Sequence, residues 1–137
     1  TVAAHATGAW DPSRGAVVRA LLDSLVVRLA ARIDDIDGYL GGGRDTVHVV
    51  GGGSRIDGLM QDLADATGRR VVAGPVEATA LGNAAVQWQA LGAVASLAQA
   101  RAAIAGLPDV RTFEPRGDRA PWQAAAARLA QMTGAGP

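Results

Sequence analysis

The feature that most constrains the fold is a strand, a helix and a second strand within residues 46–73. The run TVHVV, residues 46–50, is apolar on both faces apart from His48, which is typical of a strand buried in a parallel sheet. Residues 56–67 carry apolar side chains at helical spacing, and RRVVA, residues 69–73, reads as a second short strand. The residues of this helix expected to face inward are Leu59, Met60, Leu63 and Ala64. The chain is therefore predicted to be α/β, helix-rich with a short parallel sheet.

Further helices are predicted on either side of this unit. From Asp11 to Leu40, apolar residues recur every three or four positions, as on one face of a helix about 40 Å long at ~1.5 Å per residue. The residues of that face are Val18, Leu22, Leu25, Leu29, Ile33, Ile36 and Leu40. Helices are also expected at residues 77–92, 96–105 and 121–132, with an extended arm at 110–116.

The composition favours one globular unit and limits its chemistry. With 137 residues and 49% hydrophobic side chains, the chain is long enough to bury a core. Basic and acidic residues balance at 13 each, so no overall field attracts nucleic acid or an anionic membrane. All the basic residues are arginine, so this chain has no P-loop lysine, and without cysteine it has no thiolate nucleophile. Two histidines alone make a poor metal cage, and no metal site is expected.

The chain shows no signal for export or membrane insertion. No stretch resembles a signal peptide, and no apolar run approaches the ~18 residues of a membrane span. We therefore expect a cytoplasmic protein with neither a membrane nor a nucleic-acid partner. The first residue is Thr1 rather than methionine, which leads us to expect a piece of a longer protein.

Two triple glycines flank the first strand, and they invite different interpretations. Gly41, Gly42 and Gly43 follow a helix, where a C-cap and a loop need positive φ and little else. Residues 51–53 instead lie between a strand and a helix, in the crevice at the carboxyl end of a parallel sheet where ligands bind in α/β folds. Bare backbone there can approach a flat ring or a phosphate, close to the amides of the next helix's N-terminus. From spacing alone, a ligand site and a simple tight turn are equally good interpretations.

The usual phosphate-binding fingerprints do not describe the second triple glycine. Ile56 takes the place of the last glycine of G-x-G-x-x-G, and no lysine follows as G-x-x-x-x-G-K-[ST] requires. A dinucleotide-dependent oxidoreductase is therefore not expected.

Polar side chains elsewhere are expected to be structural. His48 is interpreted as a core or edge histidine with a hydrogen-bond partner, and Glu77 as a carboxylate that satisfies backbone amides at a helix start. The acidic residues of the second helix are expected on its solvated face, and they are Asp57, Asp62 and Asp65.

Four segments in a fixed order give a more specific indication. They read HVVGGGSRIDG from His48, then ADATGRRVV, GPVEATALGNA and FEPR, which ends at Arg116. In this order and spacing they resemble the C-terminal domain of carbohydrate kinases of the FGGY family, and within it the rhamnulokinase branch. The resemblance extends from about Ser13 to Arg116.

The resemblance implies a sugar kinase with ATP and sugar bound in the cleft between two domains. It implies that residues 1–137 are the C-terminal part of the kinase's C-terminal domain, a partial ribonuclease-H-like domain of the actin-like ATPase superfamily. The glycine turn would border adenine and ribose. On that basis the cofactor-binding residues would be Gly51, Gly52, Gly53, Ser54 and Ile56. Relatives usually carry an asparagine at the position of Ile56, and isoleucine can pack on a ring but cannot hydrogen-bond to it.

The resemblance also implies what lies outside this chain. The family's aspartate general base and its phosphate-binding hairpins belong to upstream sequence, so no catalytic residue is expected here and the chain alone should be inactive. ATP, Mg²⁺ and the sugar substrate would be held mainly by that absent part. The alternative is a non-catalytic α/β association module that keeps the kinase fold, which the isoleucine at position 56 favours.

An incomplete sheet has a consequence for assembly. Two strands leave an unpaired edge and an apolar face that invite a partner. We therefore expect a homodimer or other self-association, through the side of the sheet or the apolar face between Val18 and Leu40.

Overall fold

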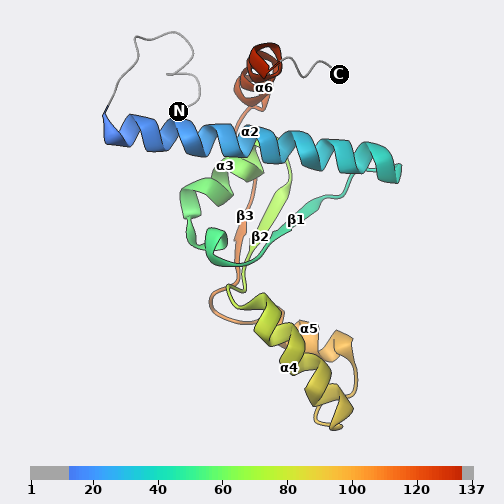
Figure 1. Ribbon diagram of the computed structural model, residues 1–137. Coiled ribbons are helices and arrows are strands. Elements are labelled where there is room, and N and C mark those ends of the chain that lie inside the picture. Colours follow the sequence, from blue (N-terminus) through green and yellow to red (C-terminus); the bar gives the residue numbers. More distant parts are fainter. Residues whose placement is uncertain (1–12, 134–137) are drawn as a thin grey trace.

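The computed structural model describes residues 13–133, and its elements follow the predicted order (Figure 1). They are α2 (Arg14–Leu40), β1 (Thr46–Val49), the short 3₁₀ helix η1 (Gly52–Arg55), α3 (Asp57–Thr67), β2 (Arg70–Ala73), α4 (Ala78–Ala90), α5 (Leu97–Ala105), β3 (Arg111–Phe113) and α6 (Ala120–Thr133). The expected start at Asp11 lies outside the described residues. Ser13 is the N-cap of α2, and its Oγ accepts a hydrogen bond from the Ala16 amide at 3.3 Å.

The sheet has three strands in the order β1-β2-β3, and it is mixed rather than parallel. β1 and β2 pair in parallel, from Thr46 opposite Arg70 to Val49 opposite Ala73. β3 pairs antiparallel with β2, so that Ala73 lies opposite Arg111. The prediction of a short parallel sheet is therefore confirmed for β1 and β2 but incomplete, because the arm at 110–116 contains a strand that pairs antiparallel with the second edge of β2.

β1 is an edge strand, which corrects the expectation that it is buried on both sides. Val47 and Val49 are half-buried against the core, whereas His48 is exposed. The apolar sequence of this strand thus overstates its burial, since only the face with Val47 and Val49 packs on the core, and the opposite face, with His48, is exposed.

The core lies between α2, α3 and the sheet. Its buried residues are Val26, Leu59, Met60, Leu63, Ala64, Ala66, Val71 and Ala73, with Trp122 of α6 packed against them. All four residues predicted to point inward from the second helix are among them. The periodicity of α3 was therefore a sufficient guide to its buried face.

The buried face of α2 differs from the predicted one. Leu22 and Ile33 pack against the core, but the other five residues of the predicted stripe are between 38% and 55% exposed. These five residues, named the α2 stripe below, are Val18, Leu25, Leu29, Ile36 and Leu40. The residues of α2 that are buried instead are Asp23, Val26, Val27 and Asp37.

Ion pairs explain the rotation of α2. Arg19 donates to Asp62 of α3, 2.5 Å between Nη2 and Oδ2, and also to Asp23 of its own helix. Burial alone would lower the pKa of the Arg19 guanidinium, but its hydrogen bonds to Asp23 and Asp62 outweigh that effect and raise it. Arg69, beyond α3, pairs with Asp37 near the other end of α2. Charged contacts near both ends therefore hold α2 against α3 and the residues that follow it, with Leu22 and Ile33 on the core side between them.

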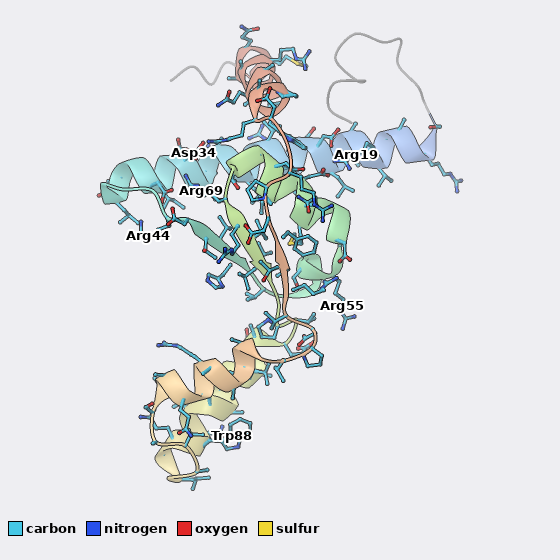
Figure 2. The ribbon with its side chains drawn as sticks, turned by 180° about the vertical axis from the view of Figure 1, so that it is seen from behind. Arg19, Asp34, Arg44, Arg55, Arg69 and Trp88 are labelled. Atoms are coloured by element: carbon cyan, nitrogen blue, oxygen red, sulfur yellow. The ribbon has the colours of Figure 1, made fainter. Side chains whose placement is uncertain are left out.

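Helices α4 and α5 form an arm that projects away from this body (Figure 1). They pack mainly on each other, and Ala85 and Ala100 are their buried residues. Trp88 lies on the arm and is exposed (Figure 2). No helix between residues 13 and 133 is long and apolar enough to cross a membrane.

Candidate functional site

The second triple glycine forms a turn at the carboxyl end of β1. Gly51 has φ 86° and ψ −173°, a conformation that only glycine adopts readily. Its amide donates to the Pro75 carbonyl at 3.4 Å, and the Gly74 amide donates to Val49 at 2.8 Å. The turn after β1 is thereby tied to the turn after β2, at the edge of the sheet where α/β proteins bind ligands.

Ser54 closes the glycine turn from the inside. Its hydroxyl donates to the Gly51 carbonyl at 2.7 Å, its amide donates to the same oxygen at 3.1 Å, and the residue is 1% exposed. The Ser54 side chain is thus part of the support of the turn rather than of its outer surface.

Gly52 and Gly53 form the outer surface of the turn. Both are exposed, neither has a positive φ, and a Cβ on either would meet no atom within 4 Å. Neither the backbone conformation nor packing within the chain therefore requires glycine at these two positions. What their missing side chains do provide is open space over the backbone.

Ile56 lies at the end of the same turn, as the N-cap of α3. It is 45% exposed, and its side chain makes no capping hydrogen bond. Serine, threonine, aspartate and asparagine are the usual residues at an N-cap. The position thus combines an exposed apolar surface beside Gly52 and Gly53 with an uncapped helix start. Arg55, just before it, points away from the body (Figure 2).

The structure brings two residues to this site that the sequence analysis did not single out. Arg111 of β3 donates to the Ser54 carbonyl, 2.8 Å from Nη2, and forms an ion pair with Asp57. Asp109 accepts a hydrogen bond from the Val76 amide at 3.2 Å. The sequence did signal a turn at the partner of Asp109, since Gly74 and Pro75 precede Val76. It gave no signal for Arg111, because β3 has three residues and is too short to show an alternating pattern.

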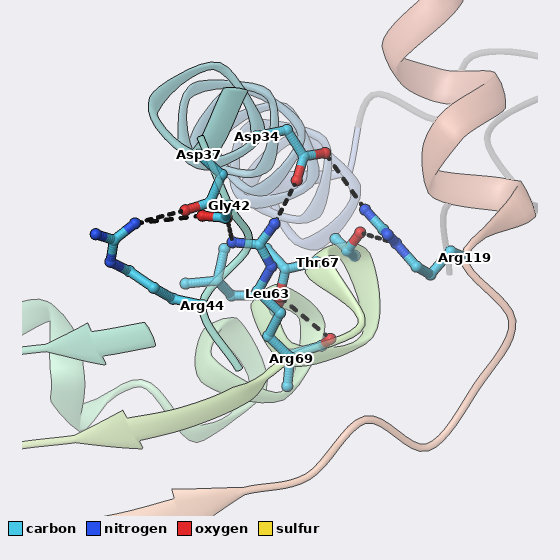
Figure 3. Close-up of polar contacts among 10 residues, drawn as sticks. Asp34, Asp37, Gly42, Arg44, Leu63, Thr67, Arg69 and Arg119 are labelled. Atoms are coloured by element: carbon cyan, nitrogen blue, oxygen red, sulfur yellow. Dashed lines mark hydrogen bonds and ion pairs between the residues drawn. The ribbon is translucent and has the colours of Figure 1, made fainter. Parts of the chain in front are cut away.

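The first triple glycine has the structural role that was predicted. Gly41 is the C-cap of α2 with φ 73°, and the amides of Gly41 and Gly42 both donate to the Asp37 carbonyl. Arg44 donates to the Gly42 carbonyl at 3.3 Å, and Arg69 pairs with Asp37 (Figure 3). The loop is therefore held against its own helix and strands.

A hollow of about 720 Å³ lies beside this loop, at the opposite end of the sheet from Gly51. Its arginines are Arg44, Arg69, Arg70 and Arg119. Each of them forms an ion pair, with carboxylates contributed by Asp34, Asp37 and Glu114. We interpret the hollow as a structural ion-pair network rather than an anion site.

The three acidic residues of α3 have partners within the fold. Asp57 pairs with Arg111, Asp62 with Arg19, and Asp65 accepts from the Arg116 amide at 2.7 Å, so these carboxylates join elements rather than only facing solvent. Glu77 is the N-cap of α4, but its side chain makes no capping bond, contrary to expectation. Across residues 13–133, no three His, Cys, Asp or Glu side chains are grouped so that they could hold a metal ion.

An α/β body with a bare glycine turn at the carboxyl ends of its parallel strands is typical of a ligand-binding domain. Residues 5–91 match the sequence model of the FGGY family of carbohydrate kinases, C-terminal domain. The chain therefore belongs to this family, which confirms the resemblance found in the sequence.

Individual relatives agree with the family assignment. The chain is 39% identical to a rhamnulokinase of Bacteroides thetaiotaomicron over 82% of its own length and 23% of the relative's. It is 37% identical to a rhamnulokinase of Halalkalibacterium halodurans over 61% of its own length and 18% of the relative's. It is also 35% identical to a rhamnulokinase of Klebsiella pneumoniae over 74% of its own length and 21% of the relative's. The chain thus spans about a quarter or less of the curated relatives that it matches.

Proposed function

We propose that this chain is the nucleotide-binding side of an ATP-dependent sugar kinase of the rhamnulokinase type. Such an enzyme transfers the γ-phosphoryl group of ATP to a hydroxyl of its sugar. Membership of the FGGY family and the rhamnulokinase relatives support the proposal. The partial ribonuclease-H-like fold, with residues 1–137 as the C-terminal part of the C-terminal domain, belongs to the same proposal.

The observation that carries the proposal is the bare surface of Gly52 and Gly53. Adenine and ribose need a flat backbone surface that they can approach closely, and the missing side chains of Gly52 and Gly53 leave such a surface open at the carboxyl end of β1. Ile56, 45% exposed beside the turn, offers an apolar contact for the face of the ring. Gly51 and Ser54 hold the turn in shape behind that surface.

The phosphates and the metal call for groups that this chain does not bring together. Phosphoryl transfer depends on positioning, on Mg²⁺ and on neutralisation of the phosphate charge. Among residues 13–133 no acidic cluster could hold Mg²⁺. We propose that the rest of the enzyme supplies the general base and most contacts to sugar, phosphates and Mg²⁺, so that this chain alone is inactive.

Titration with ADP, followed by amide NMR signals, tests the proposal. The amides of Gly52, Gly53 and Ser54 should shift before all others, with weak affinity because most phosphate contacts are missing. Gly41, Gly42 and Gly43 serve as an internal control, since their loop is at the other end of β1. No shifts at millimolar ADP, or shifts confined to the control loop, would overturn the assignment.

A second candidate function is a non-catalytic association module that keeps the kinase fold. The α2 stripe favours it, because these five apolar residues lie exposed on one side of the helix. We propose that a second copy of the chain covers them in a homodimer. Sedimentation at micromolar concentration should show a dimer that Leu25→Asp disrupts, and a stable monomer would contradict this. The cytoplasmic location and the absence of membrane and nucleic-acid partners stay predictions.

A further inference from the structure

The surface of the glycine turn depends on two neighbouring turns keeping their relative position. One follows β1 and contains Gly51 to Arg55, and the other follows β2 and contains Gly74 to Val76. The 3.4 Å bond from the Gly51 amide to the Pro75 carbonyl joins the two turns directly, and the 2.8 Å bond from the Gly74 amide to the Val49 carbonyl joins the second turn to β1. A turn held in this way gains from an additional brace outside β1 and β2.

The segment from Asp109 to Arg111 contacts both turns. The Asp109 side chain accepts from the Val76 amide at 3.2 Å, and its carbonyl lies 2.6 Å from the place where a Cβ on Gly74 would be. Two residues later, Arg111 donates to the Ser54 carbonyl at 2.8 Å. A single short segment, which leads from a turn into β3, therefore braces the second turn with a carboxylate and the first turn with a guanidinium.

The contact of Arg111 with Ser54 joins two elements that are not neighbours in the sheet. Arg111 belongs to β3, while Ser54 follows β1, and β2 lies between them. The guanidinium lies 5.9 Å from the centre of the Phe113 ring, a cation–π contact that orients it.

The geometry of the guanidinium explains what this contact does. One nitrogen donates to the Ser54 carbonyl at the inner side of η1, and another pairs with Asp57 in the first turn of α3. A planar fork with two fixed donors sets the orientation of η1 relative to α3, which a lysine ammonium cannot do. The residues whose position is set in this way include Gly52, Gly53 and Ile56.

We propose that Arg111 is a positioning residue for nucleotide binding, which holds the glycine turn in its binding shape, with Asp109 holding the neighbouring turn. The part of this proposal that concerns nucleotide rests on the proposed function. The part that concerns the turn does not, and the two can be measured separately.

The first experiment measures the turn without nucleotide. Amide hydrogen exchange is followed for Ser54 and Ile56, whose amides donate within the turn to Gly51 and Gly53. Arg111→Ala should speed their exchange about tenfold, as expected for loss of a charge-assisted hydrogen bond. Arg70→Ala is the matched control, because it also removes an arginine–carboxylate pair, Arg70 with Glu114, but at the end of the sheet away from the glycine turn. Equal exchange rates at Ser54 in the two variants would overturn the positioning role.

The second experiment measures ADP affinity by the same NMR titration, with thermal unfolding recorded in parallel. Arg111→Ala should weaken ADP binding about tenfold, Arg111→Lys should restore only part of it, and Arg70→Ala should leave it unchanged at a similar melting temperature. Faster exchange with unaltered affinity would show that the brace is structural only and would overturn the nucleotide part. Absence of ADP binding by the unmodified chain would refute the proposed function, while the exchange measurement still decides whether Arg111 holds the turn.

Discussion

The two triple glycines lie at opposite ends of the same strand, and the chain uses them differently. At residues 41–43, Gly41 adopts φ 73° to end α2, and Gly42 uses both its amide and its carbonyl within the protein. At residues 51–53, Gly51 is required by its backbone conformation, whereas a Cβ on Gly52 or Gly53 would meet no atom within 4 Å, as is also true of Gly42. The two loops therefore differ in their place in the fold rather than in the space around their glycines. The first is held by ion pairs at the start of β1, and the second lies exposed at the carboxyl ends of the parallel strands, where α/β proteins bind ligands.

The largest loss of stability is expected at the first loop, because ion pairs of Asp37 hold this loop in place. Asp37 is 8% exposed and pairs with Arg69 and Arg44. Asp37→Ala should lower the free energy of unfolding by roughly 2–3 kcal/mol, toward the value for breaking a buried pair, because Arg69 would lose a largely desolvated partner. Urea denaturation measures it, with the exposed Asp35→Ala as control. ADP binding should not change, and a loss of affinity would show that the two loops are coupled.

A smaller loss of stability is expected from Gly51→Ala, at about 1–3 kcal/mol, because alanine is strained at φ 86° and ψ −173°. Gly41→Ala should cost about 1–2 kcal/mol, since a left-handed residue with φ 73° tolerates alanine somewhat better. Thermal or urea unfolding of the two variants compares them directly. If Gly51→Ala proved as stable as the unmodified chain, the conformational requirement at this position would be wrong.

The sharpest test of the comparison uses alanine at Gly52 and Gly53. Stability should hold or rise by up to ~1 kcal/mol, because alanine restricts the unfolded chain and meets no clash in the folded one. ADP affinity should fall about tenfold, equivalent to ~1.4 kcal/mol, since a methyl group would occupy the space over the backbone. Gly42→Ala is the matched control. An NMR titration in which Gly52→Ala binds ADP as well as Gly42→Ala does would remove the difference between the loops.

The smallest effect is expected at Ile56. Asparagine there would cap α3, adding about 1 kcal/mol to the free energy of unfolding. It would also add a hydrogen bond to adenine, worth ~0.5–1.5 kcal/mol of affinity. Ile56→Ala is the control, because it removes the apolar side chain without adding a cap or a hydrogen bond to adenine. Improved unfolding free energy without improved ADP binding would indicate that the isoleucine is adapted to its ligand.

Much of this architecture could be read from local patterns. The helices and first two strands follow from periodicity, and Gly41 and Gly68 end α2 and α3 with left-handed backbone as their positions suggest. The inward face of α3 was predictable because its apolar residues form one continuous side. These features depend on residues that are neighbours in the sequence.

The features that were missed depend on contacts between distant residues. β3 is too short to be recognised and forms only because it pairs with β2. The orientation of α2 follows from Arg19 with Asp62 and Arg69 with Asp37, which no periodicity reveals. For the site, the sequence pointed to the glycine turn, but not to Arg111, whose partners lie more than fifty positions away.

The arm of α4 and α5 has a consequence for the architecture of the chain. The polypeptide leaves the sheet at Gly74 and returns at Asp109, and these residues touch, since a Cβ on Gly74 would lie 2.6 Å from the Asp109 carbonyl. In topological terms β2 and β3 form a hairpin whose loop has been replaced by a helical cassette. The entropic cost of closing a loop rises only slowly with its length, so this helical insertion can be lengthened, shortened or exchanged without changing how the strands pair. Evolution can therefore remodel what the arm contacts while the register of β2 and β3 stays the same.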